Sequence, residues 1–253
     1  MQIDFKRLDY YRRKALLDLR DMIRGPRYTL DGMTFTVPRG APPGPRKQLI
    51  RGTYEKAERE LVGKWLPADL ATIELGGSYG IVSYTIRKAL APDARLVVVE
   101  ANPGLIETCR ANLALAGPMD RTSIIAAALA YDDAETVRFS VTEAHHTSHV
   151  TDRADTAAGT IEVPAITLSD LLAREGIDGA FSLVCDIEGA ELELLRNETE
   201  ALKSCACMVM ELHPLAFRSA GSSLHEVMTR IEDAGLEIVD QREQVIVACP
   251  RRA

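Results

Sequence analysis

The chain has no long apolar run, fewer basic than acidic residues, and no paired cysteine motif. No hydrophobic stretch approaches the roughly 20 consecutive apolar residues of a membrane-spanning helix, so a helical membrane protein is not expected. Residues 1–13 are polar and charged and lack the apolar centre of a secretory signal peptide. The five cysteines include no Cys-x-x-Cys pair, which predicts reduced thiols, with Cys205 and Cys207 on one side of a strand. These absences together predict a cytoplasmic protein.

The charge balance is acidic and unevenly distributed. The 253 residues carry 30 basic and 37 acidic side chains, a net charge of −7, which argues against a general nucleic-acid-binding protein. Residues 1–51 hold 12 basic and 5 acidic side chains, whereas residues 52–253 hold 18 basic and 32 acidic ones. Residues 1–51 thus carry a net charge of +7 and residues 52–253 one of −14. Only the first of these segments could contact the phosphates of a nucleic acid.

Residues 1–50 are expected to form a basic, mainly helical extension. Helical spacing covers residues 4–24 and stops at Gly25-Pro26. The apolar face of this helix contains Leu8, Tyr11, Ala15, Leu16, Leu19 and Ile23. The helix could pack on the main domain, pair with a second copy in a homodimer, or offer a basic face to an acidic substrate or a membrane surface.

Residues 51–253 alternate strand-like and helix-like segments, which predicts a doubly wound α/β domain with a Rossmann-like, mostly parallel sheet. Strands are expected at residues 71–75, 95–100, 122–129, 181–187 and 205–212. Helices are expected at residues 53–65, 80–90, 103–116, 168–175, 189–203 and 222–234. Two last strands, at 236–240 and 244–249, are too close for a crossover helix and should be antiparallel. A parallel sheet that ends in an antiparallel strand is typical of methyltransferases rather than dehydrogenases.

Two segments interrupt this pattern. Residues 38–46 contain four prolines and two glycines, and so predict a loop or linker after a hairpin at residues 28–37. Residues 131–166 are interpreted as an insertion on the substrate side, with strands near 135–141 and 160–166. The insertion contains His145, His146 and His149, whose spacing suits a metal ion; a substrate-binding loop is the favoured interpretation.

The stretch from Ala71 to Gly80 has the pattern of a cofactor-binding turn. A short apolar strand is followed by Gly76, Gly77 and Gly80, and helical spacing follows; such a turn lets a ligand approach the backbone closely. The dinucleotide pattern Gly-x-Gly-x-x-Gly needs a glycine where Ser78 stands, so S-adenosylmethionine is favoured over NAD. The expected cofactor residues are Glu74, Gly76, Gly77, Ser78 and Gly80.

The next strand ends in an acid that suits a ribose. Glu100 lies about 20 residues beyond the glycines, where a carboxylate can bind both ribose hydroxyls. Ala101 follows it and is included in the predicted cofactor site. The alternative is that Glu100 belongs only to the start of the helix after Asn102-Pro103.

Acidic residues gather at the ends of two later strands. Asp186 and Glu188 follow a buried strand, and Glu191 comes just after them in the next helix. Buried unpaired acids are costly, so a ligand, a basic partner or a metal is expected, although Glu191 could simply charge the helix start. Glu211 and His213 end the following strand on one face, where His213 could deprotonate a hydroxyl group.

With these residues the chain resembles the FkbM-type methyltransferases over roughly residues 50–215. The matching segments are Gly52-Thr-Tyr-Glu55, Ile73 to Gly80, Val99 to Pro103, Thr167 to Leu172, Asp186 to Glu191 and Glu211 to Pro214. The family usually has Asp at the position of Glu74, Asn near Ser78, and often Lys at the position of Val184. The resemblance implies S-adenosylmethionine-dependent methylation of a hydroxyl group on a sugar or natural product.

The sequence therefore predicts an O-methyltransferase that acts by direct in-line displacement. His213 is the first candidate for the base, with Asp186, Glu188 and Glu55 as positioning or alternative acid–base groups. Asp186 is also a candidate cofactor contact. A divalent metal is possible near Asp186 but is not predicted, and no metal ligand is assigned. The alternatives are an NAD-type oxidoreductase and a catalytically inactive cofactor-binding module.

Overall fold

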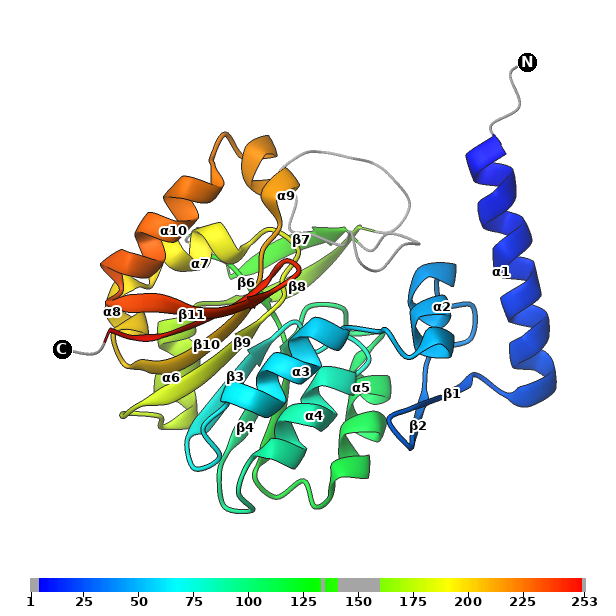
Figure 1. Cartoon of the computed structure of the whole chain (residues 1–253), viewed down its shortest axis with the longest axis horizontal. Coiled ribbons are helices and arrows are strands. Elements are labelled where there is room, and N and C mark those ends of the chain that lie inside the picture. Colours follow the sequence, from blue (N-terminus) through cyan, green and yellow to red (C-terminus); the bar gives the residue numbers. More distant parts are fainter. Residues whose placement is uncertain (1–4, 133–134, 141–159, 252–253) are drawn as a thin grey trace.

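A seven-stranded sheet forms the centre of the molecule (Figure 1). The computed structural model describes residues 5–132, 135–140 and 160–251. The strand order is β11-β12-β10-β9-β3-β4-β5. The five strands that run parallel to one another are β3 (Ala71–Leu75), β4 (Leu96–Glu100), β5 (Thr122–Ala126), β9 (Phe181–Cys185) and β10 (Cys205–Glu211). Strand β12 (Val245–Pro250) is antiparallel to β10 and to β11 (Leu236–Arg242), which confirms the predicted sheet with its reversed C-terminal strand.

Helices cover both faces of this sheet (Figure 1). One layer contains α3 (Lys56–Trp65), α4 (Ile81–Ala89) and α5 (Ile106–Leu113), followed by the short helix Ala114–Ala116. The other contains α6 (Leu168–Glu175), α7 (Glu191–Asn197), α8 (Thr199–Leu202) and α10 (Leu224–Asp233). Side chains of β4 alternate between them, since Val98 packs in the first layer and Val97 in the second. This burial on both faces explains why the strands are continuously apolar.

Several predicted elements are divided or shifted. The strand expected at 122–129 splits into β5 and β6 (Ala128–Leu129), because β6 leaves the main sheet and pairs with β8 (Thr160–Ile166). β8 also pairs with β7 (Thr136–Ser140), so the inserted region adds a small three-stranded sheet. The helix expected at 189–203 breaks at Glu198, whose buried carboxylate accepts hydrogen bonds from Ser169 of α6. Helix α9 (Pro214–Ser219) was not predicted.

The prediction that Cys205 and Cys207 share one side of a strand is wrong. The register of β10 against β9 shifts between these two residues. Because this bulge offsets the alternation, Cys205 packs in the layer of α6 and α7 and Cys207 in the layer of α3 and α4. All five cysteines are free thiols, as the sequence predicts.

The first 50 residues form α1 (Phe5–Arg24), the hairpin of β1 (Arg27–Leu30) and β2 (Met33–Thr36), and most of α2 (Pro43–Arg51). The helix and the hairpin are confirmed, and the hairpin turns at Asp31 and Gly32, whose φ angles of 49° and 78° are left-handed. The loop predicted for residues 38–46 is wrong in its second half, where α2 begins. Proline fits the first turn of a helix because its missing N–H has no partner to lose there.

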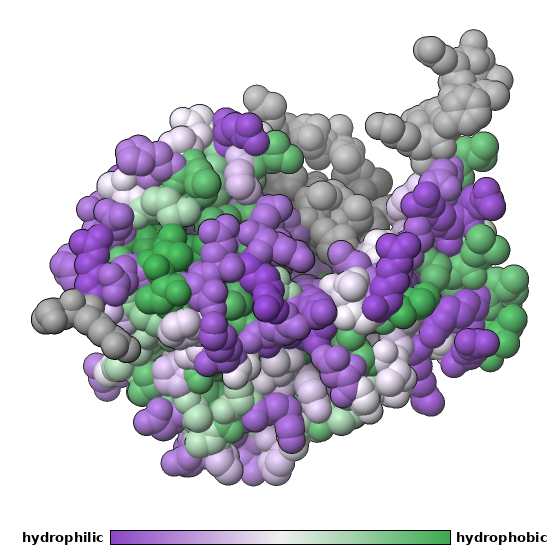
Figure 2. All heavy atoms as spheres, viewed as in Figure 1, coloured by the Kyte–Doolittle hydropathy of each residue, from purple (hydrophilic) through white to green (hydrophobic). Residues whose placement is uncertain are grey.

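Helix α1 docks through its polar face. Asp21 is buried and accepts hydrogen bonds from the Tyr28 hydroxyl (2.8 Å) and the Arg46 guanidinium (3.1 Å). The large aliphatic side chains of the predicted apolar face point outward instead, and Leu19 and Ile23 are 53% and 75% exposed. Figure 2 shows hydrophobic residues along the outer edge of the molecule at this helix. None of the described helices combines the length and apolar composition needed to cross a membrane.

Candidate active site

The glycine turn after β3 lies against the ends of the two neighbouring strands. The N–H groups of Gly76 and Gly77 both donate to the Val99 carbonyl oxygen of β4, at 2.9 and 3.1 Å. The N–H of Asp186, after β9, donates to the Leu75 carbonyl oxygen. Gly76 has a φ of +94°, and a Cβ at this position would collide with the Asp186 carbonyl oxygen. Only glycine therefore allows the three strand ends to meet this closely.

A cavity, which we call the cofactor cavity, opens at this junction. Its polar lining comes from the glycine turn and the two neighbouring strand ends, and its apolar lining from β4 to β7. The lining includes Gly76, Ser78, Glu100, Ala101, Leu129 and Phe139. One wall is thus polar backbone and carboxylate, and the other is apolar, which suits a nucleoside with a polar tail.

Glu100 is positioned by backbone groups on both sides. It is 6% exposed, and its two carboxylate oxygens accept hydrogen bonds from the N–H of Ser78 and the N–H of Asn102, each at 2.6 Å. Burial raises the pKa of Glu100, and these two hydrogen bonds oppose the increase. Each oxygen still has a second lone pair for a ribose hydroxyl. The ribose contact stays a prediction, and the alternative role at the Asn102 turn holds at the same time.

The remaining predicted cofactor residues lie behind the cavity. Gly77 and Gly80 shape the turn and do not line the cavity. A Cβ on Gly80 would come within 2.5 Å of the Cys109 carbonyl oxygen, so this glycine lets α4 pack against α5. Glu74 is also outside the lining, buried on the face of β3 opposite Ile73 and Leu75. A direct contact between Glu74 and a cofactor thus stays a prediction without support from its position.

A second cavity, which we call the acidic chamber, adjoins the first. Six carboxylate residues line it: Glu55, Glu58, Asp186, Glu188, Glu211 and Glu243. Lys56 is the one lysine or arginine in the lining that the described residues provide, and His213 is the one histidine. Glu55, Asp186 and Glu188 line both cavities, so the two spaces meet at these three side chains.

The residues around the two cavities also carry most of the unusual backbone conformations. Five described residues other than glycine have a left-handed φ. Asp31 belongs to the hairpin turn, whereas Glu55, Ser78, Glu188 and Glu243 line one or both cavities. Such conformations are costly for residues with a Cβ and tend to cluster at functional sites. Their location supports an assignment of the two cavities as one site.

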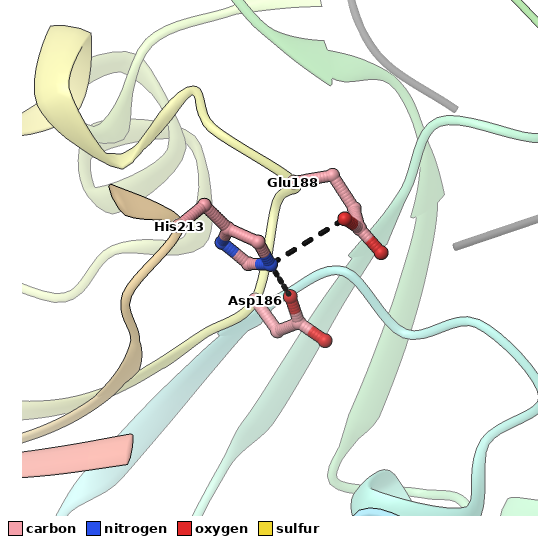
Figure 3. A group of neighbouring side chains, drawn as sticks. All are labelled: Asp186, Glu188 and His213. Carbon is pink, nitrogen blue, oxygen red and sulfur yellow. Dashed lines mark ion pairs between the residues drawn. The ribbon is translucent and has the colours of Figure 1, made fainter. Parts of the chain in front are cut away.

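His213 faces two of these carboxylates (Figure 3), and the carboxylate of Glu191, outside the chamber lining, holds its ring from the other side. Its Nε2 atom lies 3.6 Å from Asp186 Oδ1 and 3.4 Å from Glu188 Oε2. Its Nδ1 atom lies 3.0 Å from Glu191 Oε1, an oxygen that also accepts the Ile187 N–H. Glu191 is fully buried, and we assign the ring proton to Nδ1, so that Nδ1–H donates to the Glu191 side chain. Glu191 therefore fixes the ring, and the Nε2 side faces the chamber.

The pKa values of the facing groups rise together. Burial raises the pKa of Glu55 to about 8 and that of Glu188 to about 7, in the latter case against the opposing effect of His213. Burial alone would lower the pKa of His213, but its hydrogen bond to Glu191 and the neighbouring carboxylates outweigh this and raise it to about 9. At neutral pH the chamber thus retains protons that a cation could replace.

The structure brings together all four predicted catalytic residues and adds one that the sequence interpretation missed. Glu58 of α3 is 3% exposed, lines the acidic chamber, and forms no hydrogen bond or ion pair with the other described residues. A signal was present, because Glu58 lies one helical turn after Glu55 and beside the apolar residues Ala57, Leu61 and Val62. The three histidines of residues 145–149 lie outside the described part of the chain.

Comparison with known proteins gives one family. The model of the methyltransferase FkbM domain matches residues 74–238, which is more than half of the chain. The match covers the glycine turn, the end of β4, the Asp186 to Glu191 segment and His213. No curated protein matches the chain.

Solved structures are similar at low sequence identity. A Streptococcus agalactiae protein of the NADB-Rossmann superfamily is 11% identical, covers 76% of this chain and 67% of its own, and gives a TM-score of 0.46. The pyocyanin biosynthetic protein PhzM is 18% identical; the match covers 83% of this chain and 58% of PhzM, with a TM-score of 0.44. The mitomycin 7-O-methyltransferase MmcR is 15% identical; the match covers 82% of this chain and 57% of MmcR, with a TM-score of 0.43.

Proposed function

The chain belongs to the FkbM methyltransferase family, and from this premise we propose that it methylates a hydroxyl group of a sugar or natural product with S-adenosylmethionine. The observation that supports this proposal is the pair of adjoining cavities. One has the lining expected for the cofactor, the other has acid–base groups, and Glu55, Asp186 and Glu188 belong to both. Methyl transfer needs this arrangement, because donor and acceptor must meet in line.

The lining of the cofactor cavity fits S-adenosylmethionine. The Cβ-free backbone of Gly76 leaves room for close approach, and Glu100 offers free lone pairs to a ribose. When bound, this cofactor supplies an electrophilic methyl group on a cationic sulfonium. Asp186 and Glu188 lie at the junction, where burial raises their pKa values, and by releasing their protons they can balance that cation. Ser78 and Ala101 complete the proposed cofactor contacts.

The groups of the acidic chamber would orient the acceptor and take its proton. His213, whose pKa is raised to about 9, accepts at Nε2 once the ring has lost a proton, while Glu191 holds Nδ1–H. Glu188 and Glu55, whose pKa values are raised to about 7 and about 8, are the carboxylate alternatives. Positioning can contribute on the order of 7–11 kcal/mol to the lowering of the barrier, and a base about 10²–10⁴-fold in rate.

A methyl-transfer assay tests this proposal. The chain is incubated with S-adenosylmethionine labelled in the methyl group and a panel of sugar and natural-product hydroxyl compounds, and label in the product is counted. We expect transfer to at least one hydroxyl class, and loss of transfer in His213→Ala. Tight cofactor binding without transfer to any acceptor would instead favour the inactive cofactor-binding module. In that case His213→Ala should bind the cofactor as the wild type does.

We also propose that the outward face of α1 pairs with a second copy of the chain. Leu8, Leu16, Leu19, Met22 and Ile23 are all exposed on the described part of this helix. The segment of residues 1–51 has a net charge of +7 and the remainder −14, so the basic helix of one copy complements the acidic body of another. Burial of the apolar face would then favour association.

Sedimentation equilibrium tests the pairing. We expect the wild type to be a dimer, the double variant Leu19→Glu/Ile23→Glu to be a monomer, and Thr229→Glu on exposed α10 to remain a dimer. A wild type that sediments as a monomer contradicts the proposal. If that monomer binds vesicles of anionic lipid, the face serves a membrane surface instead.

A further inference from the structure

We propose that the acidic chamber binds a divalent cation through His213 Nε2 and the carboxylates of Asp186 and Glu188. The inference rests on the proposed function and deepens it, because the cation would hold and activate the acceptor hydroxyl. Its starting point is the set of three ligand atoms in Figure 3, which all lie within 4.8 Å of one another.

The distances between these atoms suit a shared metal ion. A ligand set about 2.1 Å from a metal has neighbouring ligand atoms about 3.0 Å apart at right angles and about 3.4 Å apart in a tetrahedron. Nε2 of His213 lies 3.4 Å from Glu188 Oε2 and 3.6 Å from Asp186 Oδ1. Small side-chain adjustments would therefore bring the three atoms to one ion.

The histidine is already oriented as a metal ligand. Histidines that bind metals usually donate their other ring N–H to a carboxylate or carbonyl, which fixes ring and tautomer. Glu191 fills this role for His213, with Oε1 3.0 Å from Nδ1, and is itself fully buried. A histidine that acts as a general base is often held in the same way. The contact with Glu191 therefore supports a cation site only in combination with the negative charge of the chamber lining.

Glu58 also indicates a cation in the chamber. Its carboxylate is more than nine-tenths buried, faces the chamber, and has no hydrogen bond or ion pair among the described residues. Asp186 Oδ1 is likewise buried without a hydrogen-bond partner. Lys56, at the chamber, pairs at the surface with Glu60. A buried carboxylate without a partner is costly, and a cation nearby removes that cost.

The neighbouring strand does not supply the missing positive charge. Val184 of β9 is fully buried and lies directly opposite Glu74 in the sheet, so this position carries no charge. Arg59 is nearby in sequence but is bound to Asp31 and to the Tyr54 carbonyl oxygen. The acidic chamber is thus left with six carboxylates and one lysine in its described lining.

The donor set indicates the class of ion. Two carboxylates and one imidazole, with positions left for water or substrate, suit an oxygen-preferring ion such as Mn²⁺ or Mg²⁺. Bound there, the ion would lower the pKa of an acceptor hydroxyl. The hydroxyl proton passes to Glu55, the oxygen forms the new C–O bond, and the methyl–sulfur bond breaks to leave a neutral thioether.

Calorimetric titration of the full chain with MnCl₂, without cofactor, tests the site. We expect one Mn²⁺ per chain, displaced by excess Mg²⁺. His213→Ala and Glu188→Gln should weaken binding at least 10-fold, and Glu58→Gln about 3- to 10-fold. The matched controls are His225→Ala and Glu60→Gln, both exposed, which should bind as the wild type does. Thermal melts show whether each variant is folded.

The outcomes separate this inference from the proposed function. No saturable Mn²⁺ binding, or binding that His213→Ala and Glu188→Gln leave unchanged, overturns the cation site. Methyl transfer that persists at full rate in EDTA overturns the role of the ion but leaves the methyltransferase intact. Conversely, intact Mn²⁺ binding without any binding of S-adenosylmethionine contradicts the proposed function and not the site.

Discussion

The cofactor cavity and the acidic chamber share three side chains and yet differ in how their charges are satisfied. In the cofactor cavity, Glu100 already accepts two backbone hydrogen bonds, so its carboxylate is held in one position. In the acidic chamber, Glu58 has no such partner and Asp186 Oδ1 has no hydrogen bond. The first cavity is therefore preorganised for its ligand, whereas the second needs a positive charge from outside or a retained proton.

The largest expected effect is a loss of turnover, without loss of cofactor affinity, when a residue of the acidic chamber alone is changed. His213→Ala removes the group that faces the acceptor, so turnover should fall by about 10²–10⁴-fold. The affinity for S-adenosylmethionine should change by less than about 3-fold, because His213 does not line the cofactor cavity. Steady-state kinetics and calorimetry measure the two effects, with His225→Ala as the control. Equal losses of affinity and turnover would show that His213 is structural.

The next effect concerns the glycine turn of the cofactor cavity. In Gly76→Ala a Cβ meets the Asp186 carbonyl oxygen at a φ of +94°, so the turn must move. Cofactor affinity should fall by about 10²-fold or more, and stability by about 1–2 kcal/mol from the left-handed backbone alone. Gly63→Ala is the matched control, because nothing lies within 4 Å of its added Cβ, and a helical alanine is favourable. Similar melting and binding for the two variants would disprove the role of Gly76.

A smaller loss of cofactor affinity is expected when Glu100, which accepts two backbone hydrogen bonds, is replaced. Glu100→Ala leaves the N–H groups of Ser78 and Asn102 without their acceptor and removes the ribose contact. Cofactor affinity should fall by about 10–10²-fold, since a hydrogen bond to a charged group contributes about 1.5–3 kcal/mol. Glu107→Ala, at an exposed position of α5, is the control. An unchanged dissociation constant in calorimetry would remove Glu100 from the ribose site.

The smallest effect is the pH dependence of stability. The pKa of Glu188 rises from 4.5 to about 7 on folding and that of His213 from 6.5 to about 9. In both cases the folded state holds the proton more tightly, so stability is present at low pH and is lost as pH rises through these values. The melting temperature of the cation-free chain should therefore fall between about pH 4.5 and pH 9.

Two comparisons sharpen the pH prediction. Glu188→Gln should flatten the lower part of this decline, because the titrating carboxyl group is gone, whereas exposed Glu107→Gln should not. Saturating Mn²⁺ should also reduce the slope, since the cation replaces the protons. A melting temperature that rises over this range would contradict the assignment of charge in the chamber.

The sequence was most informative where local rules decide the structure. The apolar strands, the glycine turn and the acids at strand ends all follow from local pattern, and they predicted the central sheet and the meeting of Asp186, Glu188 and His213. The FkbM resemblance is confirmed by the match to residues 74–238. The position of β12 between β10 and β11 agrees with the antiparallel pair expected near the C-terminus.

What the sequence did not predict depends on packing between distant segments. Glu58 becomes a chamber residue only because α3 packs beside the ends of β9 and β10. The helix α1 docks by Asp21 and leaves Leu19 outward, against its own amphipathic pattern, because Arg46 and Tyr28 form a polar partner for it. Likewise Glu74 sits at the strand end as expected, but the alternation of β3 turns it away from the cavity.

The most direct test of the account is a calorimetric titration of the wild type and of Glu100→Ala with S-adenosylmethionine, with NAD titrated separately. We expect one S-adenosylmethionine per chain, clearly weaker binding in Glu100→Ala, and no comparable binding of NAD. Binding of neither ligand, or a preference for NAD, would contradict the assignment of the cavity beside the glycine turn as the methyl-donor site.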